Sequence, residues 1–519
     1  MCTDTRDLQP GQWFLALRGE RFDGHAFLGQ AAERGCAGAI VDAAYDPAAA
    51  PAALGLVQVP DTGLALLQLA ADVRGRFRGA VVGVTGSFGK TTTKDLAAAC
   101  LAAVAGPAHA TPGNRNNRVG MPLTVLSTPP GARAVVLELG MSGPGEMAEL
   151  AAHARPDVVA ITGVGGAHAA GCGGTVAGVA ACKAEVLGAP GCRAVVVGVG
   201  SDAAGDRALL AELKRWCAGD GGRARRVTFC GDPAGARDAA ARLPGAGVGC
   251  RVAARAIPAW GPAGHGAFSH PATAVVLEWG DGSRQDATLP GACLHDGGNA
   301  AVAAEVAARA VGLDAAGMAP AVASLARGFR RGAGRMSGGA LWGVGAGAGA
   351  PPGPAYLFDD SYNCNPTALR ASLASARAAL AAFGSGTGRL RAALGDMAEL
   401  GDAAGREHEA AVAEFAGAAG PGDTAFLVGP RYVRALAAVA RREGWEWDGP
   451  CGGGAALVVA LASGGALVAS EDAGWAGEEL GRGLRAGDVV LVKGSRGMRM
   501  ERVASALADR FGGGPAPGP

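Results

Sequence analysis

The sequence predicts an α/β protein with about three domains. At 519 residues, the chain is too long to be organised around one hydrophobic core. Short β-branched runs alternate with helix-like segments along most of its length, and one run leads into a glycine-rich turn, "VTGSFGKTTTKD". This alternation is typical of parallel sheets covered by helices. Hydrophobic residues make up 49% of the chain and charged residues 18%, which is ordinary for a globular protein.

Two stretches of alternating elements predict an N-terminal domain over residues 1–79 and a central domain over residues 80–330. In the N-terminal stretch, strand-like runs lie at 37–42 and 54–60, and helix-like segments lie at 25–35 and 63–77. In the central stretch, valine-rich runs imply a parallel, doubly wound sheet. These runs lie at 80–86, 132–140, 156–164 and 193–200. We interpret residues 202–290 as an insert with strand-like pieces, and residues 298–313 as a helix.

Residues 331–511 are expected to form a third α/β domain. Strand-like runs recur there in "YLFDDSYNCNP", "RLRAALGDMAELG", "DTAFLVG" and "DVVLVKGSRGM". Residues 337–357 contain too much glycine and proline for the interior of an element, so we expect a flexible insertion. The tail at 512–519, "GGGPAPGP", is expected to be disordered.

Charge, hydropathy and thiol content exclude several classes of protein. A formal net charge of +1 argues against a nucleic acid or a membrane surface as partner. No segment is expected to span a membrane, because the longest uncharged candidate, 158–182, is interrupted by many glycines. The 12 cysteines form no C-x-x-C pair, which indicates free thiols in a reducing compartment. We expect the cytoplasm, or the plastid stroma if the source is a photosynthetic eukaryote. The N-terminus resembles neither a signal peptide nor a transit peptide.

Lysine is rare in this chain. Of 47 basic residues, the lysines are Lys90, Lys94, Lys183, Lys214 and Lys493. A position that keeps lysine in so arginine-rich a sequence is a candidate for chemistry that needs a free amine rather than a guanidinium group.

The glycine-rich turn predicts a phosphate-binding loop. Gly86 and Gly89 let backbone N–H groups turn towards an anion at the start of a helix. Lys90 would reach the β- and γ-phosphates, and Thr91 would bind Mg²⁺. The full pattern requires a glycine at position 84, where the chain has Val84. An ordinary strand–helix turn remains the alternative, and the segment alone excludes neither a GTPase switch nor a kinase.

Polar residues that follow apolar runs are further candidates. Glu138 lies at the C-terminal end of the apolar run in "VVLELG", at the sheet edge where ligands bind, which suits a carboxylate that holds Mg²⁺ with ATP. His168 follows another such run, although a lone histidine is more often structural. Lys183 lies on a helix-like segment, where a lysine is normally a solvated residue.

Three loops also suit ligand binding. The loop "TPGNRNNRVGMPLTVL" at 111–126 is rich in amide groups, although a solvated turn explains it equally well. In "FDDSYNCNP", Asp360 could contact ribose hydroxyls while two asparagines order the loop. The glycine turn "VKGSRGM" presents Lys493, Ser495 and Arg496, which suit an anionic group.

Taken together, these segments resemble the Mur ligase family. The resemblance spans almost the whole chain, and its most specific parts are the asparagine-rich loop, "DDSYNCNP" and "KGSRGMRME". Other matching parts are "TDTRDLQPGQWFLALRGERFDGHAFL", "HDGGNAAVAAE", "GAGRM" and "LGDMAELG". The chain is most similar to the members that join D-alanyl-D-alanine to UDP-N-acetylmuramoyl-tripeptide.

The resemblance implies a domain for the UDP-sugar, a central P-loop-type ATPase domain and a Rossmann-like C-terminal domain that closes over the site. It implies ATP and Mg²⁺ as cofactors and a monomeric enzyme. The implied substrates are UDP-N-acetylmuramoyl-tripeptide and D-alanyl-D-alanine, which give the UDP-linked pentapeptide of peptidoglycan synthesis. In the implied reaction, the γ-phosphoryl group of ATP activates the terminal carboxylate as an acyl phosphate, which the dipeptide amine then attacks.

Residue roles follow from matching motif positions. Phosphate binding is implied for Gly86, Ser87, Gly89, Lys90, Thr91 and Thr92. Metal binding is implied for Thr91, Glu138, His168 and a carbamylated Lys183. Nucleotide contacts are implied for His295, Asn299, Arg335 and Asp360. Substrate contacts are implied for Thr5, Arg6, Asn114, Asn116, Asn117, Asn363, Asn365, Lys493, Ser495 and Arg496. Catalytic roles are implied for Lys90, Lys183, His168 and Arg335.

The chain departs from the family pattern at several places. Ala170 stands where the family has an acid, and Asp296 stands where it has an asparagine. Gly198 replaces an asparagine after a strand. The chain also begins without the first strand that precedes "TDTR" in the family, so the first domain is expected to be trimmed or its start misassigned.

Two alternatives to this function stay open. One is a sister Mur ligase that adds another amino acid. The other is a non-catalytic relative kept as a scaffold, for example in a plastid. Whether the third peptide residue is lysine or diaminopimelate also stays open.

Overall fold

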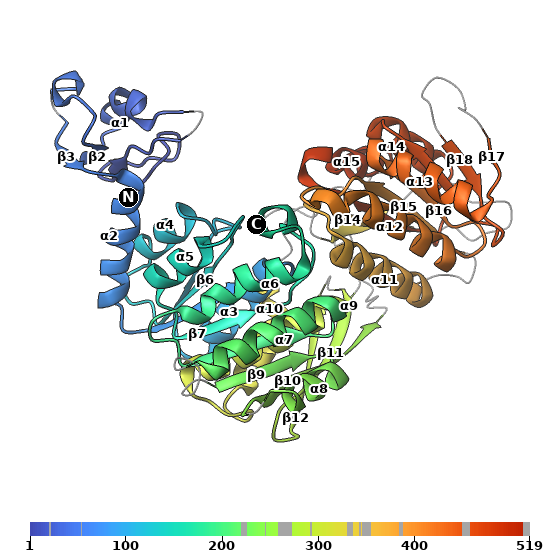
Figure 1. Cartoon of the computed structure of the whole chain (residues 1–519), viewed down its shortest axis with the longest axis horizontal. Helices are drawn as coiled ribbons and strands as arrows, with labels where there is room; N and C mark the ends of the chain where they lie inside the picture. The colour runs from blue at the N-terminus through green and yellow to red at the C-terminus, as the bar shows by residue number, and fades with distance from the viewer. Residues whose placement is uncertain are drawn as a thin grey trace.

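The described strands lie in three sheets, which follow one another along the chain (Figure 1). The computed structural model describes residues 1–19, 22–52, 54–219, 226–243, 245–257, 272–290, 293–329, 336–341, 344, 354–383, 388–448 and 457–511. We refer to the units built on these sheets as the N-terminal, central and C-terminal domains. The prediction of a three-domain α/β protein with mostly parallel sheets is therefore confirmed.

The N-terminal domain is a small parallel sheet in the order β1-β2-β3. Its elements are β1 (Trp13–Leu15), η1 (Gly24–Phe27), α1 (Leu28–Glu33), β2 (Gly38–Asp42), η2 (Pro47–Ala49), β3 (Leu56–Val59) and α2 (Thr62–Arg76). The Asp61 carboxylate accepts a hydrogen bond from the Leu64 N–H and so caps the start of α2. Helix α2 extends from this domain to the central one, and the N-terminal sheet stands at its far end (Figure 1).

The central sheet has the strand order β12-β11-β10-β9-β8-β7-β4-β6-β5. Its strands are β4 (Ala80–Thr85), β5 (Ala108–Ala110), β6 (Ala134–Glu138), β7 (Val158–Ile161), β8 (Ala194–Val199), β9 (Arg226–Gly231), β10 (Gly247–Ile257), β11 (Ala272–Glu278) and β12 (Arg284–Pro290). The pairs from β5 to β10 are parallel, and the last two pairs are antiparallel. The stretch 202–290, which we expected as an insert, contributes β9, β10, β11 and β12 to this sheet, because β9 pairs with β8.

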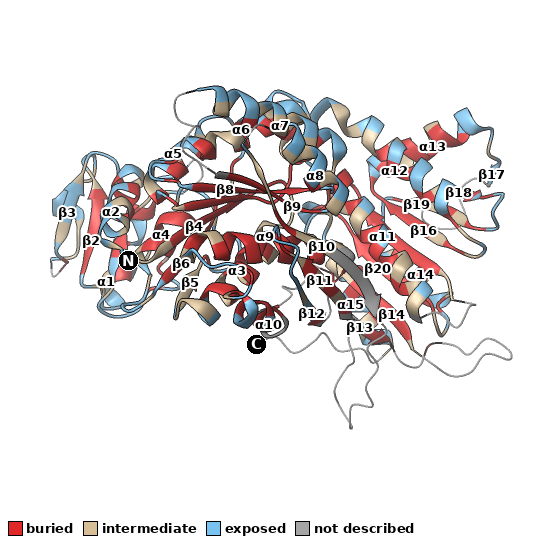
Figure 2. Ribbon diagram, turned by 90° about the horizontal axis from the view of Figure 1, so that it is seen from below, coloured by how far each residue is buried: buried red, intermediate tan, exposed pale blue. Residues whose placement is uncertain are grey.

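Helices cover both faces of the central sheet (Figure 2). They are α3 (Lys90–Val104), α4 (Gly120–Leu126), α5 (Glu146–Ala154), η3 (Ala169–Cys172), α6 (Val176–Ala184), η4 (Glu185–Gly188), α7 (Ala203–Ala218), α8 (Pro233–Ala241), α9 (Leu294–Val311) and α10 (Ala319–Gly328). One core packs α5, α6, α7 and α8 on one face, and the other packs α3, α9 and α10 on the opposite face. Strands that are buried on both sides need continuous apolar runs, which explains the valine-rich segments of the sequence.

The C-terminal sheet has the order β13-β14-β20-β15-β16-β19-β18-β17. Its elements are β13 (Ser337–Leu341), β14 (Ala355–Asp360), α11 (Pro366–Phe383), β15 (Leu390–Gly395), η5 (Gly401–Ala403), α12 (Ala404–Ala418), β16 (Thr424–Val428), α13 (Pro430–Glu443), β17 (Trp447–Asp448), β18 (Leu457–Ala460), β19 (Ala466–Ser470), α14 (Ala473–Arg482), β20 (Val489–Lys493), η6 (Arg496–Met498) and α15 (Glu501–Arg510). The inner strands are parallel, with α11, α12 and α13 on one face and α14 and α15 on the other.

The prediction of a flexible insertion at 337–357 is wrong at both ends of that range. Residues 337–341 form β13, which pairs antiparallel with β14. Within the described sheet β13 is the edge strand, and backbone pairing with β14 holds it although glycine weakens a strand interior. The positions between the two strands lie outside the described residues apart from 344 and 354, and so does the predicted disordered tail at 512–519.

Among the described helices, none combines the length and the apolar character needed to cross a bilayer.

A buried ion pair aligns two central strands of the C-terminal sheet. Asp488 immediately precedes β20 and Arg389 immediately precedes β15. The Asp488 carboxylate accepts hydrogen bonds from the Arg389 backbone N–H at 3.0 Å, from its Nη2 at 2.7 Å and from the Arg485 N–H at 2.9 Å. The Asp488 side chain is 1% exposed, so these bonds replace all of its hydration.

Asp488→Ala is expected to lower the free energy of unfolding of the C-terminal domain by about 3–5 kcal/mol, because the partly buried Arg389 guanidinium group and two backbone N–H donors lose the carboxylate that they share. The midpoint of urea denaturation measures this change. Asp509→Ala removes an exposed carboxylate from α15 and serves as the matched control. Equal midpoints for the two variants would show that the pair contributes little.

Candidate active site

The loop predicted to bind phosphate, which we call the phosphate-binding loop, connects β4 to α3 and packs closely against two other elements. Gly86 has φ +149° and Gly89 has φ +74°. A Cβ atom at Gly86 would lie 2.1 Å from Thr162 Oγ1, and one at Gly89 would lie 2.3 Å from Asn299 Oδ1. Both positions therefore require glycine, for conformation and for space. Lys90 Nζ donates to the Gly86 carbonyl at 2.8 Å, beside the N-terminus of a 15-residue helix whose first N–H groups suit an anion.

A buried carboxylate lies beside this loop. Glu138 is 1% exposed, and its Oε2 accepts a hydrogen bond from Thr91 Oγ1 at 2.9 Å. Its Oε1 accepts one from Asn116 Nδ2 at 2.8 Å. Within the described residues, Glu138 forms no salt bridge, so its negative charge is held only by neutral donors. A cation at this position would offset the cost of burying that charge.

The chemistry of these donors fits Mg²⁺. Carboxylate and hydroxyl oxygens are hard ligands, and Mg²⁺ usually binds through one or two carboxylates together with substrate phosphates and water. In the part of the chain that the structure describes, no group of three or more His, Cys, Asp or Glu side chains is arranged to hold a metal. The remaining ligands would therefore come from the phosphates and from water.

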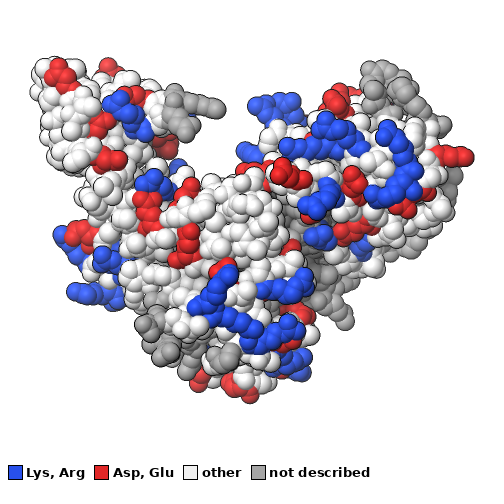
Figure 3. Space-filling model, in the orientation of Figure 1, with Lys and Arg blue, Asp and Glu red and all other residues white. Residues whose placement is uncertain are grey.

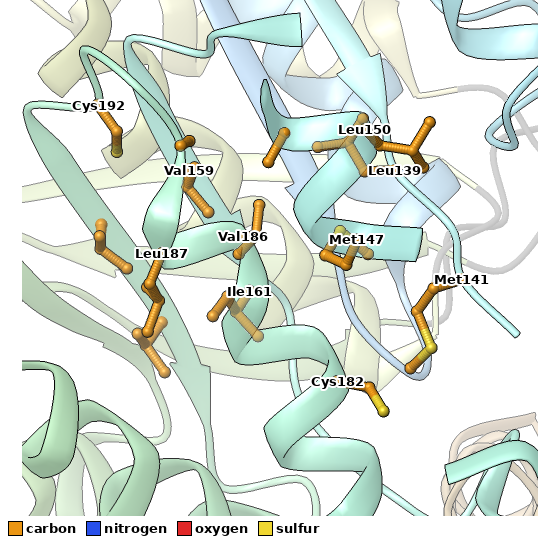
Figure 4. Close-up of a cluster of buried hydrophobic side chains, with 14 of the residues drawn as sticks. Leu139, Met141, Met147, Leu150, Val159, Ile161, Cys182, Val186, Leu187 and Cys192 are labelled. Carbon is orange, nitrogen blue, oxygen red and sulfur yellow. The ribbon is translucent and has the colours of Figure 1, made fainter. Parts of the chain in front are cut away.

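Lys183 is a buried amine in the same site. It is 1% exposed on α6, and burial lowers its pKa to about 7, with a further contribution from the positive charge of Lys90. Its neighbours Cys182 and Val186 belong to the apolar cluster that seats α6 and η4 against the sheet (Figure 4). Close to neutral pH, a large fraction of this amine is therefore uncharged and nucleophilic.

His168 meets a residue of the C-terminal domain. His168 Nδ1 lies 2.9 Å from Glu399 Oε2. The hydrogen bond from His168 holds the pKa of the Glu399 carboxyl below its usual value. Close by, Ala170 faces Gly401, where a Cβ atom would lie 3.4 Å from the Ala170 Cβ. The segment that carries His168 thus packs directly against the segment that carries Glu399.

The residues predicted to contact the nucleotide lie on both sides of the interface. His295 Nδ1 on α9 is 3.4 Å from Ser375 Oγ on α11. Asp360 Oδ2 accepts hydrogen bonds from Ser372 Oγ at 2.6 Å and from Lys493 Nζ. Asp296, which departs from the family pattern, is 1% exposed and caps α9 by accepting a bond from the Cys293 N–H at 2.8 Å.

Several predicted substrate residues also hold their own loops in place. Asn117 Oδ1 accepts hydrogen bonds from two backbone N–H groups at the start of α4. Asn365 Oδ1 accepts one from Ala368 N–H at the start of α11. Ser495 Oγ donates to the Asp396 carbonyl at 2.6 Å. Asn363 contributes its carbonyl, which accepts a bond from Lys493 Nζ at 3.1 Å.

Tyr362 contacts two further predicted substrate residues, Asn114 across the interface and Arg496 within its own domain. Its hydroxyl oxygen accepts a hydrogen bond from Asn114 Nδ2 of the central domain. The Arg496 guanidinium lies 5.5 Å from the centre of the Tyr362 ring. Another contact across the interface is the hydrogen bond that Thr367 Oγ1 donates to the Asp202 carboxylate.

A cavity of about 450 Å³ between the central and C-terminal domains collects most of these residues. The predicted residues that line it are Ser87, Gly89, Lys90, Thr91, Thr92, Asn114, Asn116, Asn117, Glu138, His168, Lys183, His295, Asn299, Asp360, Asn363, Asn365, Lys493 and Arg496. In the space-filling view the molecule is hollowed above the central domain, between the N-terminal and C-terminal domains (Figure 3).

Four predicted residues are not part of this lining, and one is not described. The Gly86 carbonyl accepts a hydrogen bond from Lys90, and Ser495 is buried and donates to the Asp396 carbonyl. Thr5 is buried against Gln30, and Arg6 is exposed and pairs with Asp4, both within the N-terminal domain. Arg335 lies outside the described residues.

The sequence reasoning missed other lining residues, among them Tyr362, Thr367, Ser372 and Glu399. Tyr362 and Glu399 lie in the segments "DDSYNCNP" and "LGDMAELG", which the resemblance includes. No periodicity or spacing, however, indicates which of their side chains face another domain.

Comparisons with known proteins give a consistent result. Three family models match this chain: the Mur ligase family, catalytic domain, over residues 1–74, the Mur ligase middle domain over 84–215, and the Mur ligase, glutamate ligase domain, over 349–496. Relatives from Synechocystis sp. and Bacillus subtilis, both named UDP-N-acetylmuramoyl-tripeptide–D-alanyl-D-alanine ligase, are each 45% identical over 168 residues. These matches cover 32% of this chain and about a third (36%) of each relative's length.

Longer matches exist in sequence and in structure. A solved structure titled MurF from Acinetobacter baumannii is 25% identical with a TM-score of 0.72, over 98% of this chain and 93% of that one. The ligase from Thermotoga maritima, titled as a complex with ADP, shares the fold at 23% identity and a TM-score of 0.69. A relative from Mycobacterium bovis, also named UDP-N-acetylmuramoyl-tripeptide–D-alanyl-D-alanine ligase, is 32% identical over 97% of this chain and 91% of its own length. The site geometry and this full-length similarity together show that the chain belongs to the Mur ligase family.

Proposed function

We propose that this protein is an ATP-dependent ligase that joins D-alanyl-D-alanine to UDP-N-acetylmuramoyl-tripeptide and releases ADP and phosphate. The observation that carries this proposal is the interdomain cavity. It brings a phosphate-binding loop, a buried carboxylate that suits Mg²⁺ and a buried amine together with polar residues of a second domain. The name of the full-length relative from Mycobacterium bovis supports the choice of substrates.

A carboxylate needs activation before it can form a peptide bond, because its oxygen is a very poor leaving group. Transfer of the γ-phosphoryl group of ATP to the terminal carboxylate of the tripeptide makes an acyl phosphate. The free amine of D-alanyl-D-alanine attacks the acyl carbon and loses a proton. The tetrahedral intermediate then expels inorganic phosphate and leaves the new peptide bond. The products are therefore the peptide, inorganic phosphate and the ADP that formed in the first step.

The proposal assigns a role in this scheme to each group of predicted site residues. Lys90 and the N-terminus of α3 would stabilise negative charge on the phosphoryl oxygens during transfer. Thr91 and Glu138 would hold Mg²⁺, which supplies charge neutralisation at the phosphates when bound. The predicted role of Arg335 towards the γ-phosphate, and those of His295, Asn299 and Asp360 towards the nucleoside, belong to the same proposal.

Lys183 would act as a carbamate. Only an uncharged primary amine adds CO₂, and burial at this position provides one near neutral pH. The resulting anion, with His168, would suit a second Mg²⁺.

Water would hydrolyse an acyl phosphate, so the site must exclude it. The hydrogen bonds that Asn114 donates to Tyr362 and that Thr367 donates to Asp202 join the C-terminal domain to the central one, and Asn114, Tyr362 and Thr367 line the cavity. We propose that the loops with Asn116, Asn363, Lys493 and Arg496 receive the peptide substrates there.

Three broader expectations belong to the proposal as well. The boundaries 1–79, 80–330 and 331–511 would separate the UDP-sugar, ATPase and C-terminal units, with Thr5 and Arg6 contacting the nucleotide sugar. The enzyme would act as a monomer. A substrate set of ATP and a nucleotide sugar would place it in the cytoplasm.

The most direct test is mass spectrometry of the product formed from ATP, UDP-tripeptide and D-alanyl-D-alanine. A sister ligase would form product with a different amino acid instead of the dipeptide. A non-catalytic scaffold would release no phosphate in response to either substrate while remaining folded.

Lys90→Ala is expected to lower kcat by about 100- to 1,000-fold, because it removes a cation placed at the transferring phosphoryl group. Phosphate release that depends on both substrates measures the loss. Lys214→Ala, which removes an exposed lysine from α7, should keep the parent rate. A Lys90→Ala enzyme with near-parent kcat would contradict the assignment of the loop.

Lys183→Ala is expected to lose activity and to regain part of it with acetate or propionate, which can replace the carbamate. Lys183→Arg cannot add CO₂ and leaves no space for the acid, so it should not be rescued.

Because the Lys183 pKa is about 7, the fraction of the Lys183 amine that is uncharged rises about tenfold between pH 6 and pH 8. At equal dissolved ¹³CO₂, a carbamate signal in ¹³C NMR should therefore form more fully at pH 8. Absence of both rescue and signal would rule out the carbamate.

A further inference from the structure

We propose that Glu399 is a positioning residue for His168: it reaches across the domain interface and fixes the orientation and tautomer of the imidazole ring. Glu399 is part of neither the phosphate-binding loop nor the proposed metal ligands. The role of His168 in catalysis rests on the proposed function, but the tautomer itself can be measured without it.

The two side chains come from different domains and meet at hydrogen-bond distance. His168 precedes η3 of the central domain, and Glu399 precedes η5 of the C-terminal domain. Glu399 Oε2 lies 2.9 Å from His168 Nδ1, and both residues line the cavity that contains Lys90 and Lys183. A carboxylate only accepts hydrogen bonds, so Nδ1 must carry the proton. The neutral ring then has its lone pair on Nε2, which is the form that can accept a proton or bind a cation.

Backbone conformation supports a dedicated contact. His168 has φ +65° and Glu399 has φ +62°. Left-handed conformations are uncommon for residues other than glycine, and they persist where the surrounding structure holds them. Two such residues facing each other across an interface are more than an incidental surface pair.

The packing beside the pair allows this approach. Gly401 has φ +54° and lies against Ala170, with 3.4 Å between the Ala170 Cβ and a Cβ built at Gly401. Small residues on both segments therefore let η3 and η5 come close enough for a short acidic side chain to reach the imidazole. Closure of the two domains and orientation of His168 become a single event.

The pair is too exposed to serve mainly for stability. The Glu399 side chain is 58% exposed and that of His168 is 30% exposed. Ion pairs at such positions contribute little to folding. Loss of Glu399 should therefore leave the melting temperature almost unchanged, while any effect on His168 should be specific.

The first test measures the tautomer in the full-length protein without substrates or metal. The protein is produced with ¹⁵N-labelled histidine rings, and the His168→Ala variant identifies the His168 signals among those of the eight histidines. At pH 8 the parent should show a protonated Nδ1 and an unprotonated Nε2. Glu399→Ala should reverse this pattern or average it. Glu399→Gln, whose amide oxygen still accepts a hydrogen bond, should retain it, as should the control Asp402→Asn in the same exposed segment.

The second test measures the reaction. Glu399→Ala should lower kcat by about 10- to 100-fold, the range found when a carboxylate that orients a functional histidine is removed. The Kd for ADP in the absence of metal should stay within about twofold, since the phosphate-binding loop is untouched. In the His168→Ala background, Glu399→Ala should cause no further loss, because both changes remove the same oriented ring.

Three outcomes would overturn the proposal: a parent His168 protonated on Nε2, a tautomer that Glu399→Ala does not change, or losses that add fully in the double variant. If the parent has no ligase activity, the proposed function fails, and the tautomer measurement alone decides the role of Glu399.

Discussion

The structure of the site depends on the close approach of one loop to two other elements. Gly86 and Gly89 place the backbone after β4 against Thr162 at the end of β7 and against Asn299 on α9. No larger side chain fits at either glycine without displacing these neighbours. This contact joins three segments that are distant in sequence, and it brings the start of α3 to the carboxyl edge of the sheet, where Glu138 and Lys183 also lie.

Burial gives the groups at that edge their chemical character. The carboxylate of Glu138 is held by neutral donors and suits a cation, while the Lys183 amine has its pKa lowered to about 7 by the same desolvation. One buried site therefore holds an anion that favours metal and an amine that favours its neutral form. Both properties would be lost if the apolar cluster behind α6 were opened to water.

The second domain completes the site through a few directed contacts. Tyr362, Thr367 and Glu399 each reach a partner on the central domain, and Asp360 is held by Lys493 within the C-terminal domain. Among the described residues these contacts are polar, as is usual at interfaces between domains that move relative to one another. Such an interface would suit the proposed reaction, which has to admit its substrates and then exclude water from an acyl phosphate.

The sequence by itself determined the α/β class, the main strands and helices, and the residue types of the phosphate-binding loop, because these follow from local periodicity and from backbone requirements such as those of Gly86 and Gly89. It also indicated most of the cavity lining through motif positions. Only the tertiary structure decided that strands β9 to β12 extend the central sheet, that 337–341 pair as an edge strand, and that the Asn117 and Asn365 side chains accept hydrogen bonds from backbone N–H groups where α4 and α11 begin. It also revealed Tyr362 and Glu399 at the interface. Which strands pair, and which side chains contact another domain, depends on residues far apart in sequence, and local patterns do not encode those contacts.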